Sequence, residues 1–382
     1  MLHTDMQLKW ENMRAGINAQ VDLLGKAPRV LYGEAKELLT GAAPSRIYTV
    51  GCGDSYFCGQ AAEMAIERWT GKPVEALESL EFSRYAIRTA PEDALVVAVS
   101  NSGDVARTVE CLRFATERGL SNIGVTYNPE SRLAQAAMRI LKYDYRDVGF
   151  GPGTMSYLAS VLSLLAVGLR AAELGGGLDA AGVEAELAAI EGLSPVLAET
   201  IAAAEEPAAE LGGMLTDDTK LFFLGGGPNY GTAQFAMAKM IESARHNTVS
   251  QQLEEWAHEQ YFVCVPGTVT VVLAPQGHSV DRAREQLRAV RDMKGTAVAV
   301  CAADDEETKA LADIVFPVPA GVPEHLSPLL YCVASELISY HFALANEKVM
   351  LGFDDEYRKE VNFRQIFASV IPETAPNVPS DS

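Results

Sequence analysis

The sequence predicts an α/β protein in which two copies of a parallel-sheet domain follow one another along the chain. Three pairs of segments repeat in the same order. IYTVGCGDSY at 47–56 aligns with LFFLGGGPNY at 221–230, VVAVSNSG at 96–103 with TVVLAPQG at 270–277, and NIGVT at 122–126 with AVAVC at 297–301. The offsets are 174, 174 and 175 residues. Three elements at nearly one offset indicate an internal duplication.

Within each copy, short apolar runs alternate with longer helical stretches, which is typical of parallel strands joined by crossover helices. In the first copy, residues 95–100 predict a buried strand and 105–118 its helix. In the second copy, 268–274 and 280–294 predict the same pair. Glycines 119 and 295 are expected to end these helices. Each copy is therefore expected to fold as a three-layer αβα sandwich.

The repeat also sets the expected domain boundaries. We expect N-terminal helices at 1–40, the first domain at 41–170, a helical connector at 171–215, the second domain at 216–345 and a C-terminal tail at 346–382 that closes over the functional site. A flexible linker is the alternative for 171–215, but its apolar spacing favours a helix. A long apolar helix is expected at 327–344, and the Pro- and Ser-rich end from residue 372 is expected to fray.

Composition narrows the class of protein. Thirty-one basic and 51 acidic residues leave a net charge of -20, which disfavours binding to nucleic acid. We expect no run to reach the ~18 to 20 apolar residues of a membrane span, and residues 1–10 lack a signal-peptide core. The six cysteines form no Cys-x-x-Cys pair, which favours buried thiols in a reducing compartment. We expect a cytoplasmic protein without nucleic-acid or membrane partners.

Two glycine turns, Gly51-x-Gly53 and Gly225-x-Gly227, each follow a strand and precede a helix. A dinucleotide fingerprint needs a third glycine three residues later, but those positions hold Tyr56 and Tyr230. The sequence therefore disfavours an NAD site. No motif for another cofactor or for a metal is present, and none is predicted.

The turn Ser100-Asn101-Ser102-Gly103 brings hydroxyl, amide and backbone N–H donors to the start of a helix. Such donors suit a phosphate group, although serine and asparagine also cap helices. The second copy has Ala-Pro-Gln-Gly at 274–277, without the hydroxyls and with one backbone donor removed by proline. Capping is needed in both copies but a phosphate only once, so the difference favours phosphate. Ser55 follows the first glycine turn at the same expected sheet edge.

Proton transfer is predicted for the second copy. Glu242 ends an apolar helix, where the helix dipole is expected to raise the pKa of its carboxyl group. His258 follows sixteen residues later, beside Glu254, Glu255 and Glu259. A carboxylate base with a histidine acid can move a proton between adjacent sugar carbons. The alternative is a solvated acid and a surface histidine.

Together, the paired copies, the Ser-Asn-Ser-Gly turn and the Glu242–His258 spacing resemble the sugar isomerase (SIS) superfamily. The resemblance runs over about residues 45–370 and is closer to the isomerase half of glucosamine-6-phosphate synthase and to fructosamine-6-phosphate deglycases. It implies that Gly53, Ser55, Ser100, Asn101 and Ser102 bind the sugar phosphate. It also implies that Glu242 moves a proton between C1 and C2, and that His258 enters from the neighbouring subunit of a homodimer.

Several positions depart from the family pattern. Residue 2 is Leu and no glutaminase domain precedes the first copy, so glutamine-dependent synthesis is not expected. Ala368 stands where the synthase has an imine-forming lysine. Val105 replaces a threonine that contacts phosphate, and Glu259-Gln260 replace Gly-Pro after the histidine. The missing lysine amine favours a deglycase, whose substrate carries its own amine, and the changes at 105 and 259–260 indicate an altered substrate pocket.

The predicted function is thus a phosphosugar-processing enzyme, acting on a 6-phosphorylated fructosamine or amino sugar. Alternatives are an aldose-ketose isomerase, a glucosamine-6-phosphate deaminase, or a non-catalytic phosphosugar sensor. Arg364 is a further candidate for substrate binding. His341 is expected to be a packed helix histidine and His325 a surface residue at a helix start.

Overall fold

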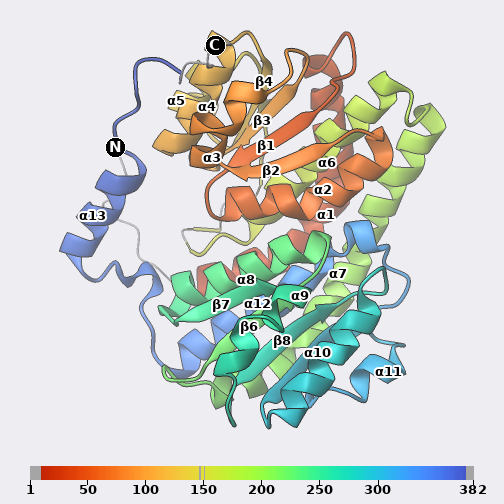
Figure 1. The fold of residues 1–382 in the computed structure, drawn as a ribbon, viewed down its shortest axis with the longest axis vertical. Helices are drawn as coiled ribbons and strands as arrows, with labels where there is room; N and C mark the ends of the chain where they lie inside the picture. The colour runs from red at the N-terminus through yellow and green to blue at the C-terminus, as the bar shows by residue number, and fades with distance from the viewer. Residues whose placement is uncertain (1–9, 146–147, 150, 376–382) are drawn as a thin grey trace. The chain divides into compact units, whose positions relative to one another are not determined.

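The computed structural model describes residues 10–145, 148–149 and 151–375, which form two compact units. The N-terminal unit contains Leu23–Tyr145, Ser156–Glu191 and the described residues from 355 onward. The C-terminal unit contains Gly192–Asp354 and the described residues among 10–22 and 146–155. Each unit contains one five-stranded sheet (Figure 1).

All strand pairs in the N-terminal unit are parallel, in the order β2-β1-β3-β4-β5. The strands are β1 (Ile47–Gly51), β2 (Val74–Glu78), β3 (Leu95–Val99), β4 (Ser121–Thr126) and β5 (Ile140–Lys142). Strands β1 and β3 are buried along their whole length. Burial on both faces is the reason why these strands are largely apolar in sequence.

The C-terminal unit repeats this topology, with parallel pairing and the order β7-β6-β8-β9-β10. Its strands are β6 (Leu221–Gly225), β7 (Thr248–Gln252), β8 (Val269–Ala274), β9 (Thr296–Ala302) and β10 (Ile314–Val318). The predicted duplication is therefore confirmed strand for strand, with β1 matching β6 and β3 matching β8.

Helices cover both faces of the N-terminal sheet. Alternate strand residues such as Tyr48, Val96 and Ala98 pack against α3 (Ser79–Arg84), α4 (Ala106–Glu117) and α5 (Arg132–Ala136). The opposite face contacts α2 (Asp54–Thr70), on which α6 (Met155–Gly175) packs so closely that a Cβ on Gly168 would lie 2.6 Å from Ile66. The 3-10 turn η1 (Ala86–Thr89) and α13 (Glu356–Ile366) complete the unit.

The C-terminal sheet is covered in the same way. One face packs against α9 (Leu253–Trp256) and α10 (Val280–Asp292), and the other against α8 (Pro228–Ala244) and α12 (Pro328–Ala345). Asn229 at the start of α8 donates to the Ser327 hydroxyl beside α12 at 2.7 Å. The shorter elements are η2 (Gln260–Val263), α11 (Glu306–Lys309), η3 (Glu324–Leu326) and η4 (Met350–Gly352). Both units are the predicted three-layer sandwiches.

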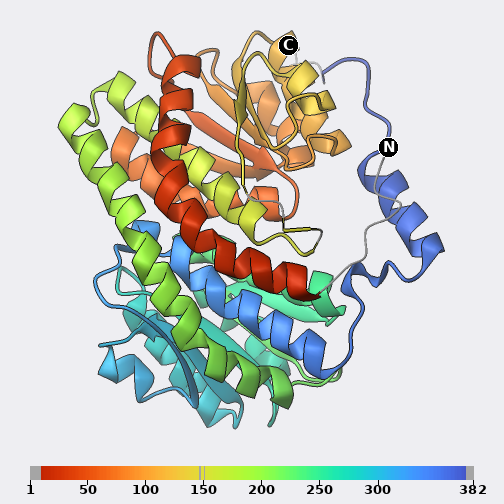
Figure 2. The same cartoon turned by 180° about the vertical axis from the view of Figure 1, so that it is seen from behind.

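Helix α12 lies beside parts of two long helices within the C-terminal unit (Figure 2). These are the first part of α1 (Trp10–Leu38) and the last part of α7 (Ala180–Met214). Gln20 of α1 donates to Glu336 of α12 at 2.6 Å, and both side chains are fully buried. His341 of α12 contacts Glu205 of α7 at 2.9 Å, so it is a packed helix histidine as predicted.

The two glycine turns have nearly the same backbone conformation. Gly53 caps α2 with φ 56° and ψ -130°, and Gly227 caps α8 with φ 52° and ψ -131°. Positive φ is strained for residues with a side chain, which explains glycine at both positions.

One predicted helix end is wrong by a residue. Gly119 follows α4 with φ 72°, as expected of a glycine C-cap. After α10, the left-handed residue is Lys294, with φ 59°, and not Gly295. Gly295 is instead required by packing, because a Cβ there would lie 2.9 Å from the Thr268 carbonyl oxygen.

The expectation that no segment is long and apolar enough to cross a membrane is also wrong. Among the described helices, three meet that criterion by length and composition: α6, α7 and α12. Each helix contains an apolar stretch of 18 residues, and 78% of this stretch is buried within the protein in α6 and in α12, compared with 39% in α7. The apolar residues of α6 and α12 therefore form core contacts of the two sandwiches.

The cysteines are buried thiols, as the sequence predicts. All six are free; five are buried and Cys52 is partly exposed. Burial raises the pKa of Cys52 to about 11, so this thiol is protonated near neutral pH.

Candidate functional site

Two groups of predicted site residues lie in different units. Gly53, Ser55 and the turn 100–103 follow β1 and β3, which are neighbours in the N-terminal sheet. Their carboxyl ends meet at one sheet edge, where ligands of such folds bind. Glu242 and His258 belong to the C-terminal unit.

The serines of the turn bond to its own backbone. Ser100, which is buried, accepts the Gly103 N–H at 3.1 Å, and Ser102 accepts the Asp104 N–H at 3.2 Å. Each hydroxyl proton then has no acceptor among the described residues and can be donated to a ligand. Gly103 has φ 70°, and a Cβ there would lie 2.0 Å from the Ser131 hydroxyl.

The capping alternative for this turn is wrong. The N-cap of α4 is Val105, which makes no side-chain cap bond. The first N–H groups of α4 therefore receive no cap from Ser100, Asn101 or Ser102. An uncapped helix start with hydroxyl donors beside it is a favourable environment for an anion.

The two arginines near this turn, Arg107 and Arg132, contact other groups of the protein. Arg132 contacts the Asp104 carbonyl oxygen and also donates to the Phe367 carbonyl at 2.7 Å. Arg107 contacts the buried carboxylate of Glu110 and the Val370 carbonyl oxygen. Both arginines thus join the turn and α4 to the segment after α13.

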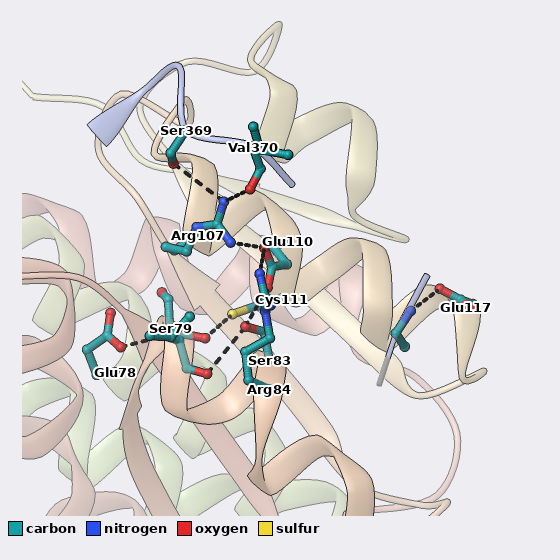
Figure 3. Close-up of polar contacts among 12 residues, drawn as sticks. Glu78, Ser79, Ser83, Arg84, Arg107, Glu110, Cys111, Glu117, Ser369 and Val370 are labelled. Carbon is teal, nitrogen blue, oxygen red and sulfur yellow. Dashed lines mark hydrogen bonds and ion pairs between the residues drawn. The ribbon is translucent and has the colours of Figure 1, made fainter. Parts of the chain in front are cut away.

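Figure 3 shows how this C-terminal segment is held on α4. Arg107 reaches Ser369 and Val370, and the Ala375 N–H donates to Glu117 at 3.1 Å. Ala368 lies between these anchored residues in sequence. The predicted closure of residues 346–382 over the site stays a prediction, and residues 376–382 lie outside the described residues. Arg364 of α13 is 64% exposed and 3.8 Å from Glu360.

Glu242 lies in the last turn of α8, as predicted, and its side chain is 32% exposed. The Lys239 ammonium, one turn earlier, donates to the Glu242 Oε2 at 2.5 Å. Lys239 is fully buried, and its Nζ lies 4.9 Å from the centre of the Phe235 ring. This ion pair places a positive charge beside the carboxylate, which the helix-dipole argument omitted.

His258 follows α9, and its side chain is 63% exposed. Its Nε2 lies 3.2 Å from Glu254, whose pKa is lowered by the hydrogen bond from this histidine. Among the described residues, no hydrogen bond or ion pair joins His258 to Glu242. Phe262 of η2, four residues later, is 74% exposed.

Two sets of residues were missed by the sequence analysis. Lys239 could have been found, because a lysine three residues before Glu242 in an otherwise apolar helix is an i,i+3 ion pair. Tyr143 and Tyr145 donate to the Asn101 side-chain oxygen at 3.0 and 3.1 Å. No sequence signal predicts these contacts, because forty-two and forty-four residues separate the partners.

Comparison with known proteins agrees with this architecture. The SIS domain family model matches residues 42–170 and 214–346. The glutamine--fructose-6-phosphate aminotransferases [isomerizing] of Mycobacterium tuberculosis (strain ATCC 25618 / H37Rv) and Pseudomonas putida are 27% and 28% identical over 307 residues. Each match covers 78% of this chain and 48% of the relative. The chain thus spans about half the length of these relatives.

Solved structures share the fold. The C-terminal domain of glucosamine-fructose-6-phosphate aminotransferase from Francisella tularensis has a TM-score of 0.74 and 19% identity, covering 89% of this chain and 97% of that one. A glucosamine-6-phosphate deaminase from Thermotoga maritima has a TM-score of 0.68 and 18% identity, covering 88% and 95%. A putative tagatose-6-phosphate ketose/aldose isomerase from Clostridium novyi has a TM-score of 0.73 and 15% identity, covering 87% and 88%. With two matched domains in tandem, this chain belongs to the SIS domain family.

Proposed function

We propose that this protein is an enzyme that moves a proton between C1 and C2 of a phosphorylated sugar, with Glu242 as the base. The observation that carries the proposal is the Lys239–Glu242 pair. Fully burying an ammonium group is costly unless it is paired. Here the ammonium is held 2.5 Å from a carboxylate that remains 32% exposed and can reach a substrate.

In the proposed reaction, the turn Ser100–Gly103 and Ser55 bind the phosphate. The Glu242 carboxylate takes a proton from one sugar carbon, giving an enediol or enaminol, and returns it to the adjacent carbon. His258 donates a proton to the ring oxygen or to the departing amine. The names of the relatives and the fold neighbours support a phosphosugar as substrate.

A 6-phosphorylated fructosamine is the proposed substrate. Its C1 carries the amine and its C2 the carbonyl group. Moving one proton from C1 to C2, and one from the amine nitrogen to the C2 oxygen, yields an imine at C1. Water then adds to C1 and the amine leaves, giving an aldose 6-phosphate. Ala368 supports this choice, since a substrate amine replaces the lysine amine that an alanine cannot supply.

The proposal is tested by proton NMR in D2O. Glucosamine 6-phosphate, fructose 6-phosphate and several 6-phosphofructosyl amino acids are each supplied to the wild-type protein. We expect deuterium at C1 or C2, and about 10³-fold less in Glu242→Gln, because removing a general base costs roughly 10²- to 10⁴-fold. Net amine release from a 6-phosphofructosyl amino acid would identify a deglycase, and ammonia release from glucosamine 6-phosphate a deaminase. Exchange without either would identify an isomerase.

The matched control is Glu285→Gln on α10. Glu285 also forms an ion pair with a basic residue three positions earlier, Arg282 at 2.6 Å, and is expected to leave exchange within twofold. Equal exchange by Glu242→Gln and wild type would contradict the proposal. Binding of a phosphosugar without any exchange would instead support the sensor alternative.

We also propose that the enzyme is a homodimer in which His258 completes the partner's site. The exposed His258 and the 74% exposed Phe262 support an interface at this surface. Sedimentation should give a dimer. Mixing inactive His258→Ala and Glu242→Gln chains should restore exchange in the mixed dimer, whereas no recovery after subunit exchange would argue against shared sites.

A further inference from the structure

Asn101 has every acceptor occupied by the protein. Its backbone carbonyl oxygen accepts the Thr126 hydroxyl at 3.2 Å and the Tyr127 N–H at 3.3 Å. Its side-chain Oδ1 accepts the Tyr143 and Tyr145 hydroxyls at 3.0 and 3.1 Å. Two bonds saturate an amide or carbonyl oxygen. What Asn101 can still offer a ligand is therefore only N–H groups.

The two tyrosines are held firmly by their surroundings. Tyr143 follows β5, is 1% exposed, and its N–H donates to the Thr126 carbonyl at 3.3 Å. Burial raises the pKa of Tyr143, so its hydroxyl stays protonated and can donate. The centre of the Tyr145 ring lies 6.0 Å from that of Tyr143, in a stacked arrangement, and 4.9 Å from that of Tyr127, in a tilted one.

This arrangement occurs in only one copy of the duplication. At an offset of 174, Asn101 corresponds to Pro275. With β5 matching β10 at an offset of 175, Tyr143 and Tyr145 correspond to Val318 and Ala320. The tyrosine pair therefore occurs together with the Ser-Asn-Ser-Gly turn, and a general need of the fold does not explain it.

We propose that Tyr143 and Tyr145 are positioning residues that fix Asn101 as a donor-only contact for the substrate phosphate. This inference rests on the proposed function. A phosphate group at neutral pH is predominantly an acceptor, whereas a sugar hydroxyl donates as well as accepts. Fixing the amide with its Nδ2 toward the ligand would favour phosphorylated over unphosphorylated sugars. It would also avoid a repulsive contact between amide oxygen and phosphate oxygen.

The test uses Tyr143→Phe, Tyr145→Phe and the double variant, which keep the rings. The readouts are KM and kcat for the best phosphosugar in the exchange assay, and the inhibition constant of inorganic phosphate. In the double variant we expect KM and the phosphate constant to rise together about tenfold, the scale of one net hydrogen bond to a charged group, with kcat nearly unchanged. Tyr127→Phe is the matched control, because its ring centre lies 4.9 Å from that of Tyr145 and its hydroxyl forms no hydrogen bond with Asn101 in the structure.

A double-mutant cycle shows whether the tyrosines act through Asn101. In an Asn101→Ala background, the tyrosine substitutions should change KM less than twofold. Additive effects, or an unchanged phosphate constant in Tyr145→Phe, would overturn the inference. Since Tyr145 is partly exposed, this single variant remains informative if Tyr143→Phe unfolds.

The outcomes separate the inference from the proposed function. If the wild-type protein neither binds nor exchanges any phosphorylated sugar, the proposed function fails. If Ser102→Ala abolishes phosphate inhibition while the tyrosine variants leave it unchanged, the proposed function stands and this inference alone fails.

Discussion

The turns after β3 and β8 occupy the same place in the two copies but have opposite character. In the first copy, Ser100 and Ser102 keep hydroxyl protons available. In the second copy, the carboxylate of Glu324 lies against the turn. It accepts the His278 N–H at 3.1 Å, and a Cβ on Gly277 would lie 2.1 Å from its Cδ.

The second turn therefore holds an internal anion at the place where the first turn leaves its donors available. A carboxylate satisfies backbone N–H groups much as a phosphate does, and its charge would repel a second anion. Duplication preserved the backbone, and the side chains leave donors for an anion available in one copy. The comparison supports a single phosphate site per chain.

The largest effect is expected when both serines of the first turn are replaced, which tests this difference between the turns directly. Ser100→Ala combined with Ser102→Ala should weaken binding of glucosamine 6-phosphate or fructose 6-phosphate by about 100-fold or more, because each lost hydrogen bond to a charged group costs about 1.5 to 3 kcal/mol. Calorimetric titration measures the change. Gln276→Ala, in the matching turn, is expected to leave binding within twofold. Equal losses in both turns would show that the copies are not specialised.

The helices after the two turns carry ion pairs of reversed sign. Glu110 of α4 is fully buried, accepts the Ser83 hydroxyl at 3.0 Å and pairs with Arg84 and Arg107. At an offset of 174, its counterpart is Arg284 of α10, which pairs with Asp305 at 2.8 Å and Glu307 at 2.6 Å.

The substitution Glu110→Gln tests what the buried ion pairs of α4 contribute to stability. It should lower the free energy of unfolding by about 3 kcal/mol, because breaking a buried pair leaves charge uncompensated. Urea denaturation followed by circular dichroism measures it. Arg107, which pairs with Glu110, also contacts the Val370 carbonyl oxygen. Limited proteolysis should therefore remove the C-terminal segment faster from the variant than from the wild-type protein. Arg284→Met should destabilise without that effect. A loss below about 1 kcal/mol for Glu110→Gln would contradict the prediction.

The smallest effect concerns Glu63 of α2, whose counterpart at an offset of 174 is Met237. Burial raises the pKa of Glu63 to about 7, although its carboxylate accepts the Ala76 N–H at 3.2 Å. Because the folded pKa lies above the unfolded one of about 4.5, the folded state binds more protons between these values. Stability should therefore fall as pH rises from about 4.5 to about 7.

Glu63→Gln should remove that dependence and raise stability at pH 7.5 by roughly 1 to 2 kcal/mol, a figure reduced for partial solvent access. Thermal unfolding between pH 5 and 8 measures it. Glu67→Gln, one turn later on α2, is the control for losing a carboxylate that accepts a backbone N–H, here that of Val74 at 3.1 Å. A steeper pH dependence in Glu63→Gln would contradict the assignment.

The sequence by itself determined the duplicated α/β fold, the elements at 95–126 and 268–302, and the asymmetry between the two turns. These features follow from local patterns: apolar runs, glycines that need positive φ, and residue types in a short turn. Glu242 at the end of its helix was predictable for the same reason.

Only the tertiary structure decided which groups contact one another over long separations. These contacts join segments 42 to 263 residues apart. They are the Tyr143 and Tyr145 hydroxyls on Asn101, the carboxylate of Glu324 beside Gly277, and the arginines that hold residues 367–370. Helix periodicity and strand alternation fix which face a residue occupies, but they do not fix its partner across the sheet edge. That choice depends on packing, which is set by the whole fold and not by neighbours in sequence.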